Sequence, residues 1–486
     1  MLIEFRVANF QCFRDETILS LVPAAQDGTL RGNIWEGRRY QALKSAAIYG
    51  PNASGKTSLL NAFKVLRSFV VSSATQMTVG DTIQGIEPFL LSAENRSRPS
   101  RFQLLVELDG HGFRYRVEAT RDRVWRENLE RQDATEKSRW IPLIDRDAAR
   151  TESEQTILHE LLGAQARRDQ IIEDTRENSL ILSRAAERNV DLIIPLFLWF
   201  KQHMHDSQGG LAAMSAPILL RGIAELATKD EEYLRALAAL VRDADTGIAA
   251  LYTHSESFFD EPLRSLRDIE KIEVPDESEK KAGISPERLK ALLNVLKSAA
   301  RGAADGMRAT EPQIAWAKFS TEHVGADGSA VPFDIAKESA GTLCYLSLAG
   351  QLLRHFKDSD LVVVDELDAS LHPQLARRIV QLVHSPDFNS SGAQLLFSTH
   401  DVTLMDPNLM RRDQVFLTQK HADGASESYS LWDFEEMPRN NAAWAKNYLA
   451  GRFGGVPIFG PLLADIPQAN EPTPLHSKAG VHSEAD

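Results

Sequence analysis

Cysteine is scarce in this chain, which has only Cys12 and Cys344 among its 486 residues. Two cysteines are too few for a disulfide framework or for a zinc ribbon. Both suit a reducing cytosol, where a free cysteine behaves as a small apolar side chain. We therefore expect a cytoplasmic protein that is held together by burial of apolar groups.

Long apolar runs and an excess of positive charge are also missing. The most apolar stretch, 192–200, is far shorter than the roughly 20 residues of a membrane-spanning helix. The first residues alternate like a strand and do not resemble a signal peptide. Lys and Arg number 55 against 68 Asp and Glu, which gives a net charge of −13. This balance disfavours bulk binding of nucleic acid, although it leaves a local basic groove open.

The remaining composition is that of a globular protein, with 43% hydrophobic and 25% charged residues. The length predicts two to four structural units. Alternating apolar residues predict strands at 3–9 and 17–22, and a hairpin across 102–117 that turns at Asp109–Gly110. Five arginines near this hairpin are interpreted either as a solvated strand face or as a basic strip: Arg114, Arg116, Arg121, Arg123 and Arg126.

Helical spacing dominates from about 152 to 306. Ser285 is a candidate N-cap followed by Pro286, and leucines at helical spacing follow in 289–296. The heptads are too short for a long coiled-coil arm. Strand and helix patterns then alternate to about 459, and the composition after 464 is typical of a tail.

A glycine-rich loop follows the short apolar strand 46–49. It matches the pattern G-x-x-x-x-G-K-[ST] and precedes a helical pattern. Glycines let successive backbone N–H groups curl around a phosphate, and the helix adds the positive end of its dipole. In this interpretation the lysine reaches the β- and γ-phosphates and the threonine hydroxyl binds Mg²⁺. The predicted ATP-binding residues are Gly50, Asn52, Ala53, Ser54, Gly55, Lys56, Thr57 and Ser58.

Two carboxylates end the apolar run 361–364. Such a run predicts a buried parallel strand, whose carboxyl end is where ligands bind in α/β sheets. We expect Asp365 to complete the Mg²⁺ shell with Thr57, and Glu366 to orient or deprotonate the attacking water. His400 ends a further strand, 394–399, and is either a capping residue or a sensor of the γ-phosphate.

A third pattern, Glu338–Ser339–Ala340–Gly341–Thr342, precedes an apolar helix at 343–356. A serine and a glycine at a helix start form either a simple cap or a second phosphate cradle.

Taken in this order, the motifs resemble the ABC-type ATPase heads of the SMC, RecF and OLD class. The resemblance implies an α/β P-loop fold in two lobes, split by a mainly helical insertion. It implies that two heads sandwich ATP, with Ser339 and Gly341 of one head touching the γ-phosphate held by Lys56 of the other. It makes Asp365–Glu366 the Walker B pair, 367–372 the D-loop and His400 the H-loop histidine.

The sequence departs from that class at several positions. The signature is not Leu-Ser-Gly-Gly-Gln, and His372 stands where many relatives carry Asp. Asn9–Phe10 resembles the Asn-Phe of RecF and SMC heads, but Gln11 replaces the usual Arg. The candidates for a Q-loop glutamine are Gln84 and Gln103.

A narrower resemblance adds the motifs 365–373, 398–401 and 448–457. Together with the signature, they resemble stand-alone prokaryotic AAA/OLD-like ATPases, such as the ATPase subunits of PARIS and abortive-infection loci. This resemblance implies a cytoplasmic defence ATPase, at least a dimer, that controls a separately encoded effector such as a Toprim-type or HNH nuclease. We expect lobe I at 1–150, the insertion at 151–310, lobe II at 311–460 and a tail at 461–486.

Other functions stay open. A RecF-like repair ATPase would clamp DNA, and the net charge of −13 disfavours it. A transporter motor is disfavoured by the atypical signature and the long insertion. A nuclease ranks last, because no further acidic or histidine cluster shows nuclease spacing. We expect no membrane partner.

Overall fold

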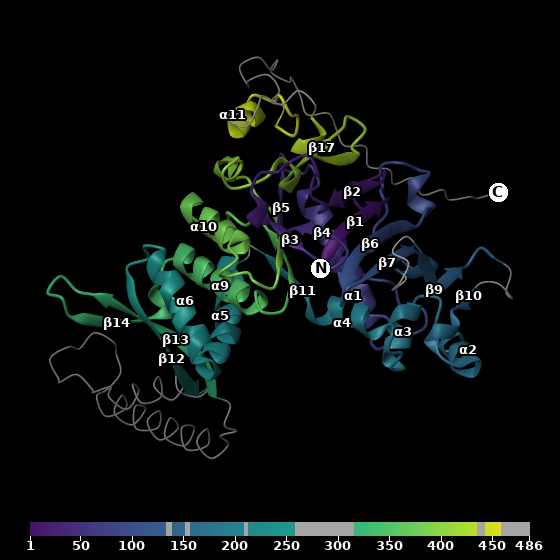
Figure 1. The fold of residues 1–486 in the computed structure, drawn as a ribbon, viewed down its shortest axis with the longest axis horizontal. Coiled ribbons are helices and arrows are strands. Elements are labelled where there is room, and N and C mark those ends of the chain that lie inside the picture. Colours follow the sequence, from purple (N-terminus) through teal and green to yellow (C-terminus); the bar gives the residue numbers. More distant parts are fainter. Residues whose placement is uncertain (133–138, 151–155, 209–211, 258–314, 435–442, 458–486) are drawn as a thin grey trace, which may run out of the picture.

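The computed structural model describes residues 1–132, 139–150, 156–208, 212–257, 315–434 and 443–457. Within them the fold is mixed α/β with several sheets, as Figure 1 shows. Two large sheets dominate, one antiparallel and one mostly parallel. A three-stranded sheet, β12-β13-β14, and a two-stranded sheet, β3-β4, complete the described strands.

The antiparallel sheet has seven strands in the order β10-β9-β8-β7-β6-β1-β2. It contains both of the strands predicted near the N-terminus and the predicted hairpin, whose strands pair from Ser100↔Ala119 to Leu108↔His111. Its strands are β1 (Leu2–Ala8), β2 (Thr17–Ser20), β6 (Ser100–Leu108), β7 (His111–Ala119), β8 (Val124–Gln132), β9 (Trp140–Asp147) and β10 (Thr156–Leu158).

The second large sheet has six strands in the order β11-β15-β16-β5-β17-β18. All neighbours are parallel except β17 and β18. Its strands are β11 (Met204–Gln208), β15 (Leu361–Asp365), β16 (Gln394–Ser398), β5 (Ser45–Tyr49), β17 (Val415–Lys420) and β18 (Ser426–Ser430). The smaller sheets are built from β3 (Ile34–Glu36), β4 (Gln41–Leu43), β12 (Ile248–Ser257), β13 (Ala315–Val324) and β14 (Ala330–Asp334).

The central parallel sheet separates two hydrophobic cores. Successive side chains of a strand point to opposite faces, so alternate residues enter different cores. Ile48 and Val363 face the core shared with the antiparallel sheet, whereas Tyr49 and Val364 face the other core. This double burial explains why the run 361–364 is apolar throughout rather than alternating.

Helices cover both faces of this sheet. Helix α1 (Lys56–Ser72) packs between the two large sheets, where Phe63 stacks on Phe5 with ring centroids 3.8 Å apart. Helices α9 (Ala340–His355) and α10 (Pro373–His384) belong to the opposite core. The other described helices are α2 (Gln165–Glu173), α3 (Ile181–Glu187), α4 (Ile194–Gln202), α5 (Ala212–Lys229), α6 (Glu231–Asp243) and α11 (Trp444–Leu449).

The middle segment, predicted as a helical insertion at 151–310, contains helices α2 to α6 in its described part. It also contributes β11 to the central sheet, where Met204 pairs with Leu361 and Gln208 pairs with Asp365. No residue pattern in the sequence indicated this strand. The predicted cap at Ser285, the leucines of 289–296 and the tail at 461–486 lie outside the described residues, and the domain boundaries stay predictions.

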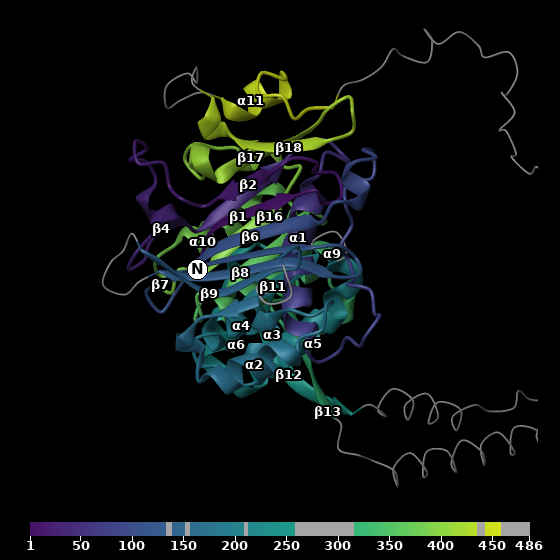
Figure 2. The same cartoon turned by 90° about the vertical axis from the view of Figure 1, so that its right-hand side faces the viewer.

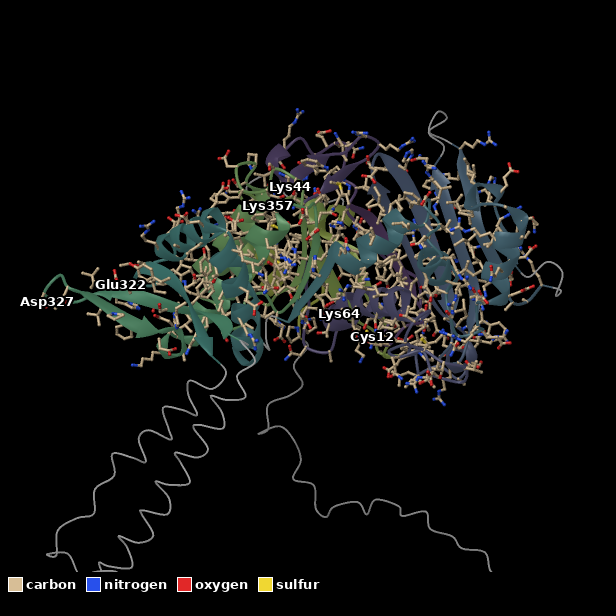
Figure 3. The ribbon with its side chains drawn as sticks, turned by 90° about the horizontal axis from the view of Figure 1, so that it is seen from below. Cys12, Lys44, Lys64, Glu322, Asp327 and Lys357 are labelled. Atoms are coloured by element: carbon tan, nitrogen blue, oxygen red, sulfur yellow. The ribbon has the colours of Figure 1, made fainter. Side chains whose placement is uncertain are left out.

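The molecule is elongated in the views of Figures 1 and 2. Figure 2 shows α11, β17 and β18 at one end and α2, α5, α6 and β12 toward the other. Figure 3 shows Asp327, in the turn between β13 and β14, at the far tip of that hairpin. Among the described helices, none has the length and apolar character needed to cross a bilayer.

The five arginines near the predicted hairpin are each paired with an acid. Arg114 meets Glu130 at 2.9 Å and Arg126 meets Asp147 at 3.1 Å. The remaining pairs are Arg116 with Glu118, Arg121 with Glu87, and Arg123 with Glu177. The side chains therefore form a mixed-charge strand surface rather than an uncompensated basic strip.

Candidate functional site

Three loops meet at the carboxyl edge of the central sheet. The glycine loop 50–55 follows β5, the acidic pair lies at the end of β15, and His400 follows β16. These strands are parallel, with β16 lying between β5 and β15. Because parallel strands end at the same edge, residues far apart in the sequence converge there.

The glycine loop has the backbone that a phosphate cradle requires. The φ angles of Ala53 and Gly55 are 61° and 114°, in the left-handed region. A Cβ at position 55 would lie 3.0 Å from both Cys12 Sγ and Phe13 Cζ, so glycine is the residue that fits. The loop leads directly into α1, whose first turn presents unpaired backbone N–H groups toward a ligand.

Lys56 bends back over this loop. Its ammonium group donates hydrogen bonds to the carbonyl oxygens of Gly50 (2.9 Å) and Pro51 (3.1 Å), and the residue is only 7% exposed. Thr57 is exposed at the first turn of α1, and Ser58 is partly exposed beside it. Asn52 and Ala53 are exposed at the tip of the loop.

Strand β17 supports the underside of the loop. The hydroxyls of Ser54 and Thr418 lie 2.6 Å apart, and Thr418 donates a hydrogen bond to the Tyr49 carbonyl at 3.0 Å. A Cβ at Gly50 would lie 2.3 Å from Thr418 Oγ1. Sequence patterns did not point to Thr418, because its role depends on β17 pairing beside β5.

The acidic pair is held by Ser398, at the end of β16. The Ser398 hydroxyl donates a hydrogen bond to the Asp365 carboxylate and accepts one from the Glu366 N–H at 2.7 Å. Glu366 has a φ of 55°, so the chain turns sharply directly after Asp365. The turn leaves Glu366 exposed while Asp365 is partly buried.

The predicted catalytic groups share one electrostatic environment. Burial lowers the pKa of Lys56, and the charges of Asp365, Glu366 and Asp368 act in the opposite direction. Burial and the Lys56 charge lower the pKa of His400, and the same three acids oppose that shift. The structure therefore brings the predicted lysine, acidic pair and histidine together at one edge.

Asp368 joins this group, and the sequence interpretation gave it no role. Its two carboxylate oxygens lie 3.2 and 3.3 Å from the His400 N–H. This contact ties the D-loop to the segment after β16. Its position in the D-loop is the only sequence signal that pointed to it, because the contact depends on the pairing of β15 with β16.

Ser339 and Gly341 lie at the start of α9 beside the D-loop. Ser339 is the N-cap, and its hydroxyl accepts a hydrogen bond from the Thr342 N–H at 3.1 Å. A Cβ at Gly341 would lie 2.9 Å from the Ser370 carbonyl oxygen. Among the described residues, this pair contacts its own helix turn and the D-loop, not the glycine loop.

A hollow of about 350 Å³ adjoins the first turn of α1. Gln11, Cys12, Ser58 and Leu91 are among the residues that line it. Asn9 supports its wall, because the Asn9 side-chain oxygen accepts a hydrogen bond at 3.1 Å from the N–H of Phe89, which lines the hollow. The side-chain amide of Asn9 also donates to the carbonyls of residues 95 and 98 at 3.0 and 2.9 Å. The asparagine of the predicted Asn-Phe pair therefore holds the loop that faces this hollow.

The Q-loop candidates lie elsewhere. Gln84 is exposed and donates to Thr82, its neighbour in the loop. Gln103 lines a hollow on the outer face of the antiparallel sheet, since Phe102 and Leu104 on the same strand face the core. The described contacts of these two glutamines do not connect them with the glycine loop.

The C-terminal motif 448–457 packs on the strand that supports the glycine loop. The Gly455 N–H donates to Gln419 Oε1 at 3.0 Å, and the Tyr448 hydroxyl donates to the Gly455 carbonyl at 2.8 Å. Gly454 has a φ of 67°, and a Cβ there would lie 2.2 Å from Gln419 Oε1. The motif therefore contacts the residue directly after Thr418.

The residues present fit a nucleotide with a divalent cation. The left-handed loop and the helix start provide N–H donors, and Lys56 provides a positive charge. Thr57 and Asp365 offer a hydroxyl and a carboxylate oxygen, the hard oxygen ligands that Mg²⁺ prefers.

Comparisons with known proteins agree with the motifs. The model of the family described as "AAA domain, putative AbiEii toxin, Type IV TA system" matches residues 45–406, well over half of the chain. A search of curated protein sequences finds no match.

Solved structures with some similarity include the SMC head domain from Thermotoga maritima, at 11% identity and a TM-score of 0.37. Another is the recombination mediator protein RecF-ATPrS in the RecFOR pathway, at 14% identity and a TM-score of 0.30. Each comparison covers 88% of this chain and 98% of the other.

Proposed function

This chain belongs to the AAA-domain family described as putative AbiEii toxin of a type IV TA system, and on that premise we propose that it binds and hydrolyses ATP. One observation carries the proposal. The glycine loop with Lys56 follows β5 and the acidic pair lies at the end of β15, so the parallel sheet places both at its carboxyl edge. A lysine beside a backbone cradle, at the same edge as two carboxylates, matches what phosphoryl transfer to water requires.

Each residue has a distinct proposed role. The backbone N–H groups of 52–57 and the Lys56 ammonium bind the β- and γ-phosphates, which replace the Gly50 and Pro51 carbonyls as partners of the lysine. Glu366 orients a water and accepts its proton, because its exposed carboxylate is free to turn toward solvent. His400 contacts the γ-phosphate and registers its loss through its link to Asp368.

Thr57 and Asp365 would hold Mg²⁺, which supplies charge neutralisation at the phosphates. The Ser398 hydroxyl orients the Asp365 carboxylate for this task. The nucleotide base would enter the hollow beside Ser58, where Gln11 stands in place of the arginine of related heads.

The signature residues support a composite site between two copies. Ser339 and Gly341 are at the start of α9, where backbone N–H groups are available to an anion, and they do not contact the glycine loop of their own chain. We propose that they complete the γ-phosphate site of a second copy, so that ATP closes a dimer of heads and hydrolysis releases it.

The biological role that we propose is control of a separately encoded effector in anti-phage defence, with a Toprim-type or HNH nuclease as the candidate. The family description, which names a toxin–antitoxin system, supports this role. The pairing of the five hairpin arginines with acids favours a protein partner over DNA. A RecF-like DNA clamp remains the alternative, and it would bind DNA with a strong dependence on salt.

Three measurements test these proposals separately. Release of inorganic phosphate from Mg–ATP tests hydrolysis, and chelation of Mg²⁺ should abolish it. Light scattering with ATP and without nucleotide tests the dimer. Co-elution with the product of the adjacent gene tests the effector role. Binding to duplex DNA at two salt concentrations, without binding to that product, would instead support the clamp.

A further inference from the structure

Three histidines surround one buried aspartate at the opposite edge of the central sheet. His203 Nδ1 lies 2.7 Å from Asp360 Oδ1, while His205 Nε2 and His355 Nδ1 lie 3.0 and 2.5 Å from Asp360 Oδ2. The rings of His205 and His355 are stacked, with centroids 3.8 Å apart. None of these residues takes part in the proposed ATP site.

The four side chains come from three separate segments. His203 directly precedes β11 and His205 is in its first half, while His355 ends α9 and Asp360 directly precedes β15. Lys357, labelled in Figure 3, marks the turn that joins α9 to β15. Since β11 and β15 are parallel, the cluster lies at their amino ends, across the sheet from the glycine loop.

From this geometry we propose that His205, His355 and Asp360 form a binding site for a divalent transition metal, with Zn²⁺ as the best match to the donors. Imidazole nitrogen and carboxylate oxygen are standard zinc ligands, at about 2.0–2.1 Å from the metal. Their ligand atoms all lie within 4.8 Å of one another. His203 supplies either a fourth ligand or the outer partner that orients the Asp360 carboxylate.

The spacing of the ligand atoms suits one metal ion. Two atoms bound to the same tetrahedral zinc lie about 3.3 Å apart, given bonds of about 2.0–2.1 Å. The His205 and His355 nitrogens lie 3.0 and 2.5 Å from the same carboxylate oxygen, so each is within about 1 Å of the separation from that oxygen that a shared zinc requires. Stacking fixes the two rings side by side in advance.

The donors are of the kinds that bind a transition metal. Asp360 supplies a carboxylate oxygen, and His205 and His355 supply imidazole nitrogens. An imidazole binds a metal through an unprotonated ring nitrogen, so metal binding would replace the hydrogen bonds that these nitrogens now share with Asp360.

A route into the site exists. His203 lines a hollow of about 700 Å³ whose other walls include Trp199, Asp358 and Ser359. Its side chain is 37% exposed, whereas those of His355 and Asp360 are 6% and 3% exposed behind it. The bound metal would clamp β11, the strand from the middle segment, to α9 and β15. Metal binding at this site would use no residue of the proposed ATP site.

The test uses the full chain without a polyhistidine tag, treated with EDTA and returned to buffer with excess Mg²⁺. Zn²⁺ is titrated in competition with a chromogenic chelator, and Co²⁺ is added separately to detect visible bands from nitrogen and oxygen ligands. We expect one tight Zn²⁺ per chain. Loss of an outer-shell partner costs about 10–100-fold in affinity, so loss of a ligand in His205→Gln should cost at least about 100-fold.

His205→Gln is the main variant because its side chain is 25% exposed and tolerates change better than buried Asp360. His421→Gln is the matched control, since His421 also faces a carboxylate, that of Glu427 at 3.3 Å, but is not part of the histidine cluster. Zn²⁺ should raise the unfolding temperature of the wild type and of His421→Gln, but not of His205→Gln. Equal Zn²⁺ affinity in folded wild type and His205→Gln, or no stoichiometric binding, would overturn the proposal.

Discussion

The Ser398 hydroxyl donates a hydrogen bond to the Asp365 carboxylate, and this contact joins two of the loops that form the candidate ATP site. The same hydroxyl accepts the Glu366 N–H at 2.7 Å. Ser398 belongs to the motif 398–401, but the sequence interpretation gave it no role; in the structure it fixes both members of the acidic pair. Ser398 can reach the acidic pair because it ends β16, which lies directly between β15 and β5 in the sheet.

Ser398→Ala should slow ATP hydrolysis by about 10–100-fold, the usual effect of losing an outer-shell partner of a metal ligand. Nucleotide binding should change less, because Lys56 and the glycine loop are untouched. Steady-state phosphate release measures kcat and KM separately. Ser347→Ala is the control, since the buried Ser347 hydroxyl lacks a hydrogen-bond partner in the described part of the chain. A wild-type kcat in Ser398→Ala would show that Asp365 does not need the hydrogen bond from Ser398.

Lys56→Ala should weaken ATP binding at least about tenfold, because the lysine provides the positive side chain at the phosphate cradle. Equilibrium binding of a fluorescent ATP analogue measures the effect. Lys64→Ala is the control on the same helix, where Lys64 faces Asp206 at 3.9 Å instead of the glycine loop. Unchanged binding in Lys56→Ala would place the nucleotide elsewhere.

A buried histidine predicts acid sensitivity of the fold. Burial, with the Lys44 charge, lowers the pKa of His384 to about 3. The unfolded chain thus takes up a proton near pH 6.5 that the folded chain refuses until about pH 3, so stability falls as the pH drops through this range.

From pH 7.5 to 5.5 His384 should cost about 1 kcal/mol of unfolding free energy. Urea denaturation at the two pH values measures it. His384→Gln should remove this part of the pH dependence, while His421→Gln, at an exposed site, should retain it. If the unfolding free energy of His384→Gln changed with pH as much as that of the wild type, His384 would not be the source of the acid sensitivity.

Gly454→Ala should destabilise the fold by about 1–3 kcal/mol, as expected for a side chain forced into a left-handed backbone position. The added Cβ would also lie 2.6 Å from the Tyr429 hydroxyl. Chemical denaturation measures the free energy of unfolding of Gly454→Ala and of a control, Gly28→Ala, whose added Cβ would have no neighbouring atom within 4 Å. Equal stability of the two variants would mean that the C-terminal motif does not clamp β17.

The features predictable from sequence were local ones. The glycine loop, the strand at 361–365 and the hairpin at 102–117 follow from patterns of adjacent residues, and the structure contains all three elements. The contacts of Ser398, Thr418 and Asp368 depend on which strands become neighbours, which no local pattern specifies. Strand β11 is short and lies at the edge of the sheet, and its sequence, Met-His-Asp-Ser-Gln, shows no apolar run.

The same reason explains why the sequence did not predict the histidine cluster. His203 and Asp360 are 157 positions apart, and they meet only because β11 pairs with β15. Taken alone in the sequence, each of these histidines is an isolated polar residue near an element boundary. The two Q-loop candidates lie away from the glycine loop: Gln103 is on the face of β6 opposite Phe102, and Gln84 is in an exposed loop.

The most direct test of the central claim is a comparison of ATP binding and ATP hydrolysis in Glu366→Gln. The change removes the carboxylate that would accept the proton from water but leaves Lys56, Thr57 and Asp365 in place. The account predicts ATP affinity within about threefold of wild type, hydrolysis reduced at least about 100-fold, and an ATP-dependent dimer that persists. Hydrolysis at the wild-type rate in Glu366→Gln would contradict it.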